Sequence, residues 1–326
     1  FYLGINLGGF FGPIVTGLLQ STLGFHVGFG IAAVGMAAGL VQYSFGRRGL
    51  PAPARRVANP LPRNKYVTAV LLAIAAIVVL VVLVLTGVIR ADNLATVVII
   101  AATVAAIAYF AVILTSRRID ATERSRVWGF LPLFITSVAF WSLYQQQFTV
   151  LTVYSDARLN RDLFGFTMPV SWVQSINPIF IIVLSGVFAA IWTKLGSRQP
   201  STPVKFALGA AVMGAAFLLF LPFANGPANS TPLLAIIGIL FVFTVAELLL
   251  SPIGLSAATK LAPAAFHTQM VALFFLSVSL GTAISGWLVT YYDPKNEVPY
   301  FSILGGIAIV VGVGLLVCAK PVLALM

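Results

Sequence analysis

The sequence has few charged residues and only one cysteine. Of its 326 residues, 8% are charged and 60% are hydrophobic, whereas soluble domains average about 25% charged residues. A water-soluble fold of this length cannot hide so much apolar surface, so the chain is predicted to be a polytopic membrane protein. A single cysteine, Cys318, excludes a disulfide framework. The two histidines, His26 and His267, are far apart in sequence, which argues against a metal site.

Long apolar runs alternate with short polar connectors along the whole chain. Each run is about 20 residues long, and strand-like alternation is absent, which favours α-helices over a transmembrane barrel. Ten candidate spans result, with Gly-, Pro- and Asn-rich turns between several of them. They cover residues 1–22, 25–45, 66–89, 94–115, 127–152, 168–193, 203–223, 232–258, 267–291 and 300–319.

The basic residues are distributed unequally between the two sides of these ten spans. When the connectors are placed alternately on the two sides, most of the 19 lysines and arginines fall on one side. The other side receives only Arg90, Arg158, Arg161 and Lys295. By the positive-inside rule the basic side is cytoplasmic, which places Met326 in the cytoplasm. The net charge of +11 is therefore a signal of membrane orientation and does not indicate a nucleic-acid partner.

Two of the spans differ from the others because they carry almost no polar side chains. Residues 66–89 and 94–115 contain nothing that could line an aqueous path. We expect them to face lipid beside a helix bundle as plain anchoring helices. The chain also opens inside an apolar segment at Phe1, so we expect an N-terminal part to be missing.

One acid, Glu247, lies inside the apolar run FVFTVAELLLSPIGLSAATKLAP, whereas the other seven acids fall in short polar connectors. An acid at the middle of a spanning helix costs about 2.5–3.5 kcal/mol, so it normally faces a bundle interior or a hydrated cavity. Ser251 lies four residues further on the same helical face, and Pro252 and Gly254 are expected to bend the helix there. We interpret Glu247 as a group that holds a proton and releases it to admit a cation or amine. A carboxyl group used only for helix packing is the alternative.

Buried amides occur in two other spans. In PVSWVQSINPIFIIV, Gln174 and Asn177 are three residues apart on one face, next to the helix-bending Pro178. They suit a binding cavity and interhelical hydrogen bonding equally well. In FYLGINLGGFFGPIVTG, Asn6 is either a ligand-binding residue or a helix-packing residue, and Gly8 and Gly12 form a small-xxx-small pair.

A fourth cluster combines aromatic residues with three consecutive glutamines. The segment AFWSLYQQQ places Trp141, Tyr144, Gln145, Gln146 and Gln147 near one end of a span. Interfacial anchoring explains the aromatic residues, but three glutamines exceed what an anchor needs, so we expect at least one to line a cavity. No phosphate-binding loop, Ser/His/Asp arrangement or HExxH motif is present in the sequence, which leaves hydrolysis and nucleotide-driven pumping without candidate residues.

Five blocks of the sequence are similar to the proton-dependent oligopeptide transporters of the major facilitator superfamily. They occur in the order and spacing of that family across the whole chain, and the first and fourth are the most specific. The blocks are FYLGINLG (1–8), FWSLYQQQ (140–147), SWVQSINPIF (171–180), ELLLSPIGLSAATKLAP (247–263) and FFLSVSLGTAISG (274–286).

The resemblance implies an all-α fold of the major facilitator type, with ten of fourteen transmembrane helices present and a start at the fifth. The first four helices, with the family's ExxER-type motif, would be absent, and we expect no transport without them. The implied parts are the last two helices of the N-terminal bundle (1–45), a cytoplasmic basic linker (46–65), two extra lipid-facing helices (66–116), a second cytoplasmic linker (117–126) and a C-terminal six-helix bundle (127–326).

The resemblance also implies roles for individual residues. Glu247 would accept the amino terminus of a peptide and take part in proton coupling. Asn177 and Asn6 would assist by hydrogen bonds, Ser251 would neighbour the glutamate, and Trp141 would line the pocket. A carboxylate beside two amides is what an ammonium group needs, because charge-assisted hydrogen bonds are about twice as strong as neutral ones.

Two positions depart from the family pattern. Gln145 stands where many members carry a glutamate that is thought to close the outer gate through an ion pair with an arginine. A neutral amide cannot form that pair, so gating or coupling is expected to differ. Phe274 stands where a tryptophan is frequent, which keeps an aromatic wall but loses the indole donor. Gln174 remains a candidate for lining the pocket.

The sequence therefore predicts a proton-coupled symporter of di- and tripeptides that works by alternating access in the inner (plasma) membrane. Its partners are the peptide, protons and the lipid bilayer. The proton is the coupling ion, and no cofactor, enzymatic activity or particular oligomeric state is predicted. The alternatives are a transporter of another small solute, such as nitrate, an amine or a drug-like molecule, and a non-transporting membrane scaffold or sensor.

Overall fold

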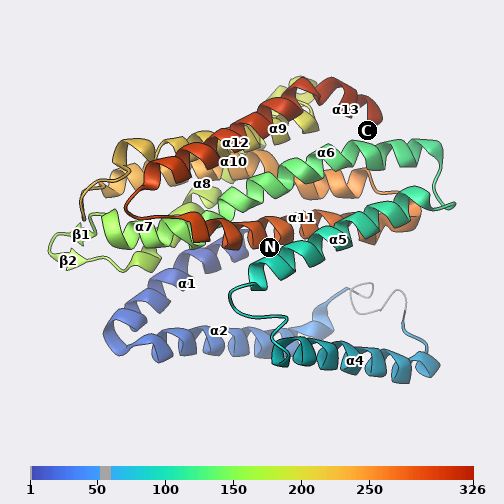
Figure 1. The fold of residues 1–326 in the computed structure, drawn as a ribbon, viewed down its shortest axis with the longest axis horizontal. Helices are drawn as coiled ribbons and strands as arrows, with labels where there is room; N and C mark the ends of the chain where they lie inside the picture. The colour runs from blue at the N-terminus through green and yellow to red at the C-terminus, as the bar shows by residue number, and fades with distance from the viewer. Residues whose placement is uncertain (1, 52–59) are drawn as a thin grey trace.

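A computed structural model describes residues 2–51 and 60–326, and most of them are helical (Figure 1). Within this part of the chain, 10 helices are long and apolar enough to cross a membrane, which confirms the predicted number. Phe1, and Arg55 and Arg56 of the basic linker, lie outside the described residues.

The helices follow the predicted spans with small shifts at their ends. The third ends at Leu85 rather than at residue 89, because a turn with Gly87 at φ 72° follows it. The first four are α1 (Tyr2–Leu23), α2 (Phe25–Gly46), α4 (Tyr66–Leu85) and α5 (Leu94–Thr115). They are followed by α6 (Ala121–Tyr144), α7 (Val150–Arg158), α8 (Ile176–Leu195), α9 (Thr202–Leu218), α10 (Leu233–Lys260), α11 (His267–Leu288), α12 (Glu297–Val317) and α13 (Ala319–Leu325). Short 3-10 helices include η3 (Gln145–Phe148) and η4 (Val170–Ser175).

A small hairpin between α7 and η4 was not predicted from the sequence. Strands β1 (Asp162–Leu163) and β2 (Phe166–Thr167) pair antiparallel, with Asp162 opposite Thr167. The turn places Gly165 at φ 86°, a conformation that glycine adopts without strain, and the Gly165 amide donates to Asp162 Oδ1 at 2.8 Å. Each strand has only two residues, too few to show an alternating pattern.

The start of α6 is fixed by a capping box. The Glu123 amide donates to Asp120 Oδ1 at 2.7 Å, and the Asp120 amide donates to Glu123 Oε2 at 3.2 Å. These bonds satisfy two backbone donors that the first helical turn leaves free. The box therefore fixes where α6 begins.

Helices α6 and α8–α12 form one bundle, and small residues bring α9 and α12 close together (Figure 1). A Cβ atom at Gly214 of α9 would lie 2.5 Å from the carbonyl oxygen of Gly305 in α12, so only glycine fits there. Close backbone approach at small residues is a usual source of helix association in membranes. Aromatic rings fill the core beside this contact, where Phe220 and Phe301 stack with centroids 4.6 Å apart.

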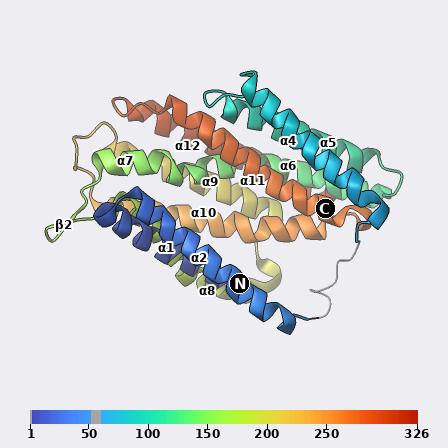
Figure 2. The same ribbon diagram turned by 90° about the horizontal axis from the view of Figure 1, so that it is seen from below.

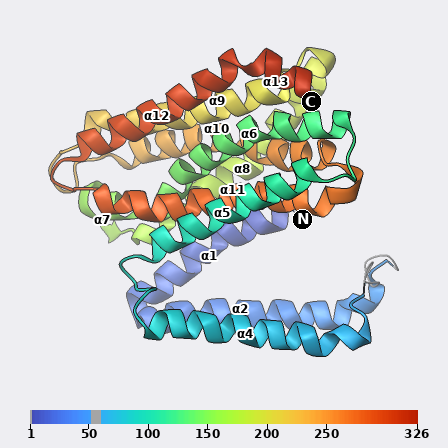
Figure 3. The same cartoon turned by 45° about the vertical axis from the view of Figure 1, so that its right-hand side comes forward.

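The remaining helices lie on two different sides of this bundle. Figure 2 shows α1 and α2 beside α8, whereas α4 and α5 lie along the other side, and Figure 3 shows α2 and α4 set apart from the bundle. Helix α5 packs on α6 and α11 through the buried residues Ala102, Ala106, Phe110 and Ile113. No residue of α4 is buried. In a bilayer α4 would contact lipid all round, whereas α5 would contact lipid along one face only.

Candidate functional site

The buried carboxyl group of Glu247 lies in the interior of α10, which continues as a helix through Pro252 to Lys260. Glu247 is 6% exposed and does not face lipid. Its partner is Asn177, the second residue of α8, whose Nδ2 donates to Glu247 Oε2 at 3.3 Å and to Thr244 Oγ1 at 3.0 Å. Both donors of the Asn177 amide are therefore used, and they hold α8 against α10.

Tyr144, the last residue of α6, completes this network. Its hydroxyl donates to Asn177 Oδ1 at 3.3 Å, and Tyr144 is also a hydrogen-bonding neighbour of Glu247. The end of α6 and the start of α8 thus meet at one carboxyl group in the interior of α10. All of these partners are neutral, and within residues 2–51 and 60–326 no cation forms an ion pair with Glu247.

Hydrogen bonds from η4 hold α1 against the start of α8. Ser175 Oγ donates to the carbonyl of Phe10 at 2.8 Å, and Trp172 Nε1 donates to the carbonyl of Ile14 at 3.2 Å. These contacts keep Asn6 of α1, which is 6% exposed, on the side of α1 that faces α8. Residues that are about 170 positions apart in the chain are thereby brought to one place.

The close approach of α1 and α8 depends on Gly9, and the predicted Gly8 and Gly12 pair is not the contact. A Cβ atom at Gly9 would lie 3.2 Å from Pro178 Cγ. At Gly8 and Gly12, a Cβ atom would meet nothing within 4 Å in the described chain. The small-xxx-small pair therefore makes no helix contact within the described chain, and Gly9 is the glycine that meets α8.

A cavity of about 320 Å³ opens where these elements meet, within the range of small-ligand pockets. It brings together Asn6, Gln174, Asn177 and Glu247, four of the residues singled out in the sequence. Its walls come from α1, the end of α6 with η3, η4 with the start of α8, and α10. The other lining residues are Ile5, Gly9, Pro13, Tyr144, Gln147, Phe148, Pro178 and Ile181.

The three consecutive glutamines have three different environments. Gln147 lines the cavity and is 3% exposed, and its Nε2 has no hydrogen-bond partner among the described residues. Gln146 Oε1 accepts a bond from Tyr300 at 3.0 Å, and Gln145 Nε2 donates to Thr282 Oγ1 of α11 at 3.0 Å. Gln147 is therefore the one that offers a donor to a ligand, and the sequence pattern did not distinguish it from its neighbours.

Two aromatic residues with implied pocket roles lie outside this cavity. Trp141 packs on α11, where a Cβ atom at Gly281 would lie 2.6 Å from Trp141 Cβ. Phe274 packs against Gly254 of α10. Each of these side chains packs in the space between two helices that a glycine, which has no side chain, leaves free.

Two polar residues from the sequence analysis also lie outside the cavity. Gln145 points to α11 and bonds Thr282, as described above. Ser251 is half-buried and lies one helical turn beyond Glu247 on α10, past the cavity wall. Helical spacing predicted that Ser251 lies on the same face of α10 as Glu247, but the cavity ends before it reaches Ser251.

A second buried acid corrects the sequence analysis, which placed every acid except Glu247 in a polar connector. Glu297, in the first turn of α12, is 0% exposed. Its carboxylate pairs with Arg158 Nε at 3.3 Å. It also accepts hydrogen bonds from the backbone N–H of Asn225 at 2.8 Å and from the Tyr292 hydroxyl at 2.7 Å. Burial raises the pKa of Tyr292, and the hydrogen bond to Glu297 raises it further, so the phenol stays protonated as a donor.

Arg158 also binds the backbone of the two loops that contain Asn225 and Tyr292. It donates to the carbonyl of Gly226, between α9 and α10, and to the carbonyl of Pro294, before α12, at 2.5 Å. The Arg158–Glu297 pair therefore ties the end of α7 to two loops on the same side of the bundle.

Comparison with known proteins agrees with this fold. The model of the POT family matches residues 1–304. The chain is 39% identical over 326 residues to the uncharacterized transporter YclF of Bacillus subtilis, covering 99% of the chain and 66% of that protein. It is 38% identical over 338 residues to a di-/tripeptide transporter of Lactococcus lactis subsp. cremoris, covering 100% of the chain and 68% of that protein.

Solved structures give the same result. A mutant of the peptide transporter POT in complex with alafosfalin superposes with a TM-score of 0.90 at 41% identity, covering 100% of this chain and 67% of that one. The chain thus spans about two thirds of the length of the relatives that it matches. The match extends over nearly the whole sequence and the whole fold, and the chain belongs to the POT family of transporters.

Proposed function

We propose that the protein carries di- and tripeptides across the cytoplasmic membrane together with protons. The observation that carries the proposal is the cavity in which Glu247, Asn177 and Asn6 meet. A carboxylate with neutral partners is poised to pair with the ammonium group of a peptide, because no cation among the described residues pairs with it. The oxygen of Asn6 and the donor of Gln147 would complete the polar contacts.

Proton coupling in this proposal uses the same carboxyl group. When Glu247 is protonated it needs no counterion, and a peptide ammonium that binds there takes the place of the proton. For symport, the displaced proton must stay on another group of the complete protein and cross the membrane with the peptide. Removal of a lone carboxylate from water is costly, so the exchange of proton for ammonium keeps the buried site neutral. The proton is the coupling ion, and the proposal requires no other cofactor.

The proposed movement is alternating access between two bundles. Helices α1 and α2 (residues 1–45) would belong to one bundle and residues 127–326 to the other, with the basic linker 46–65, the lipid-facing pair 66–116 and the linker 117–126 between them. The cavity lies between α1 and α6, α8 and α10, at the boundary that would open and close. The distribution of basic residues supports an inner-membrane location with the C-terminus in the cytoplasm.

Peptides are favoured over nitrate, amines or drug-like solutes by the names of the relatives. The Lactococcus lactis relative is a di-/tripeptide transporter, and solved neighbours hold alafosfalin or a thioalcohol-conjugated peptide. The proposal predicts that unlabelled dialanine competes with a labelled peptide for uptake. A solute that is carried without competition from dialanine would point to another substrate class.

The test is uptake into proteoliposomes that contain the complete protein, driven by an inward proton gradient. We expect Glu247→Gln to abolish gradient-driven accumulation of labelled dialanine, because the amide cannot release a proton. Asp92→Asn is the matched control, since Asp92 is an exposed acid paired with Arg90, and it should accumulate dialanine normally. Normal accumulation by the Glu247→Gln protein would refute the assigned role, and no uptake by the unmodified protein would favour a scaffold or sensor.

A further inference from the structure

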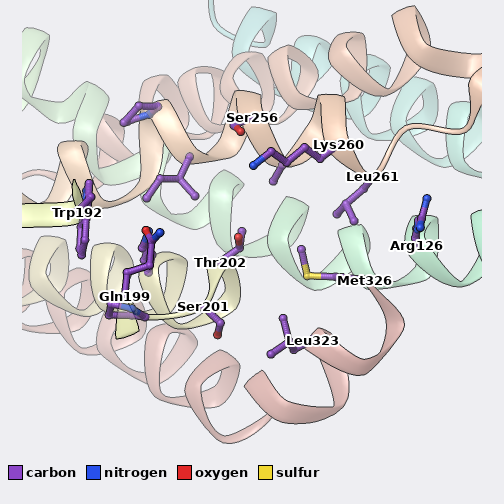
Figure 4. Close-up of a pocket in the computed structure, with 15 residues that line it drawn as sticks. Arg126, Trp192, Gln199, Ser201, Thr202, Ser256, Lys260, Leu261, Leu323 and Met326 are labelled. Atoms are coloured by element: carbon purple, nitrogen blue, oxygen red, sulfur yellow. The ribbon is translucent and has the colours of Figure 1, made fainter. Parts of the chain in front are cut away.

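A second cavity, of about 680 Å³, lies at the end of the bundle that we infer to be cytoplasmic. It shares no lining residue with the cavity around Glu247. Figure 4 shows Ser256 and Lys260 of α10 across from Gln199, Ser201 and Thr202 at the start of α9, with Arg126 of α6 at one edge. Leu323 and Met326, from the end of the chain, cover another side.

This cavity is lined by three cationic side chains and by no acidic side chain. The cations are Arg126, Lys205 and Lys260, and none of the eight acids of the sequence is among the lining residues. In the described part of the chain, none of the three has an acidic partner within 4.0 Å. The nearest acid in sequence to Arg126 is Glu123, whose carboxylate instead accepts bonds from the backbone amides of Ala264 and Asp120.

Lys205 is the most informative of the three because it is only 8% exposed. Its Nζ donates to Gln199 Oε1 at 2.6 Å and lies 4.2 Å from the centroid of the Trp192 ring. An ammonium group has three donors, and a buried charge is normally paired with an opposite charge. An amide oxygen and a ring hold this ammonium in place without neutralising it.

Groups suited to a multivalent anion surround these cations. The hydroxyls of Ser201, Thr202 and Ser256 line the same cavity. The cavity also lies at the start of α9, a helix of 17 residues in which Ser201 occupies the N-cap position without a side-chain cap bond. The partial positive charge of a helix start adds to the attraction for an anion.

We propose that this cavity is a binding site for a phosphate group. A phosphate presents several acceptor oxygens to a cluster of charged and hydroxyl donors, and charge-assisted bonds to it are the strong ones. A peptide does not suit the site, because no acid is present to receive its amino terminus. The phosphate group comes from an anionic phospholipid of the inner leaflet or from a soluble phosphate compound, and the experiment separates these two sources.

The experiment uses the complete protein with two probes. In phosphatidylcholine discs, inorganic phosphate is titrated and its binding is measured by calorimetry. In a second arm, the detergent-solubilised protein is mixed with phosphatidylglycerol, and bound lipid is counted by native mass spectrometry. Binding in the first arm identifies a soluble phosphate, and binding in the second arm alone identifies a lipid headgroup.

Two double variants test whether this cavity is responsible. Arg126→Gln with Lys260→Gln removes two lining cations, and Lys194→Gln with Arg198→Gln removes two exposed cations that do not line the cavity. We expect the first pair to weaken binding about tenfold or more, since a lost hydrogen bond to a charged group has about that effect. The second pair should change binding by less than about twofold, as expected for exposed charges.

Two results would overturn the proposal. One is equal weakening by both double variants, which would show attraction to surface charge in general. The other is the absence of binding by the unmodified protein in both arms. If the Arg126 and Lys260 double variant does not fold, Lys260→Gln alone gives the same comparison, because Lys260 is exposed. The single variant is then compared with Lys194→Gln.

Discussion

The two buried glutamates of this molecule differ in how their charge is compensated. Glu297 has a cationic partner, Arg158, and two further donors that leave its carboxylate fully bonded. Glu247 has only neutral partners, of which Asn177 donates to it at 3.3 Å. Both side chains are hidden from solvent, with exposures of 0% and 6%. Burial alone therefore does not distinguish a structural acid from a functional one, whereas the presence of a counterion does.

The comparison also explains where each glutamate lies. Glu297 joins loops at one end of the bundle, where a permanent ion pair fixes the ends of α7 and α12. Glu247 lies along α10 beside a cavity of about 320 Å³. The proposed binding of a substrate cation needs an acid without a cationic partner. Of the two buried glutamates, Glu247 has none among the described residues, whereas Glu297 pairs with Arg158.

The largest expected effect comes from breaking the ion pair. Arg158→Met would leave the carboxylate of Glu297 buried without its cation, which costs about 3–5 kcal/mol in the free energy of unfolding. Arg90→Met is the control, because the Arg90–Asp92 pair is exposed and such pairs contribute about 0–1 kcal/mol. Denaturation of the two purified variants in detergent measures both. A loss of stability no greater than that of the control would show that the cluster is not structural.

The same chemical change at the two glutamates gives a smaller but sharper contrast. Glu297→Gln leaves Arg158 without its carboxylate and is expected to lower the free energy of unfolding by about 1–3 kcal/mol. Glu247→Gln retains an acceptor for Asn177 and should change stability by less than about 1 kcal/mol. Parallel thermal unfolding of both variants checks the order. The reverse order would contradict the distinction between the two sites.

A partial effect is expected from the amide beside Glu247. Asn177→Leu removes the donor to Glu247 and the acceptor for Tyr144, so the KM for dialanine should rise about tenfold, the usual effect of one lost bond to a charged group. Uptake measured over a range of dialanine concentrations separates KM from the maximal rate. An unchanged KM would remove Asn177 from the binding site.

The smallest effect is expected at Gln145, which lies outside the cavity. Gln145→Leu loses one hydrogen bond to Thr282, so stability should fall by about 1 kcal/mol or less and the KM for dialanine should not change. The variant serves as the matched amide control for Asn177→Leu. A large rise in KM would show that the residue reaches the substrate in another conformation of the transporter.

Much of the fold and part of the cavity could be predicted from the sequence. Hydropathy gave ten spans because each apolar run needs about 20 residues to cross the membrane. The isolation of Glu247 in such a run predicted a polar cavity, and Asn6, Gln174 and Asn177 do line it. These predictions succeeded because the cost of a polar group in hydrocarbon is a local property of the sequence.

The differences between the sequence analysis and the structure concern contacts between distant segments. Helical spacing placed Ser251 on the face of Glu247, but it does not show where the neighbouring helices end the cavity. The side chains of Trp141 and Phe274 pack against glycines of other helices, and no local sequence pattern reveals such a contact. Glu297 was assigned to a connector because its partner Arg158 is 139 residues away. The sequence indicated this pair only in that Arg158 and Glu297 fall in connectors on the same predicted side of the membrane.

The contact between Glu247 and the peptide amino group is tested most directly by combining a variant protein with a blocked peptide. Binding of dialanine and of N-acetyl-dialanine would be measured for the unmodified protein and for Glu247→Gln. The account predicts that the unmodified protein prefers the free amine by about tenfold or more, and that the preference disappears in the variant. A variant that keeps the full preference would show that the amino group is recognised elsewhere.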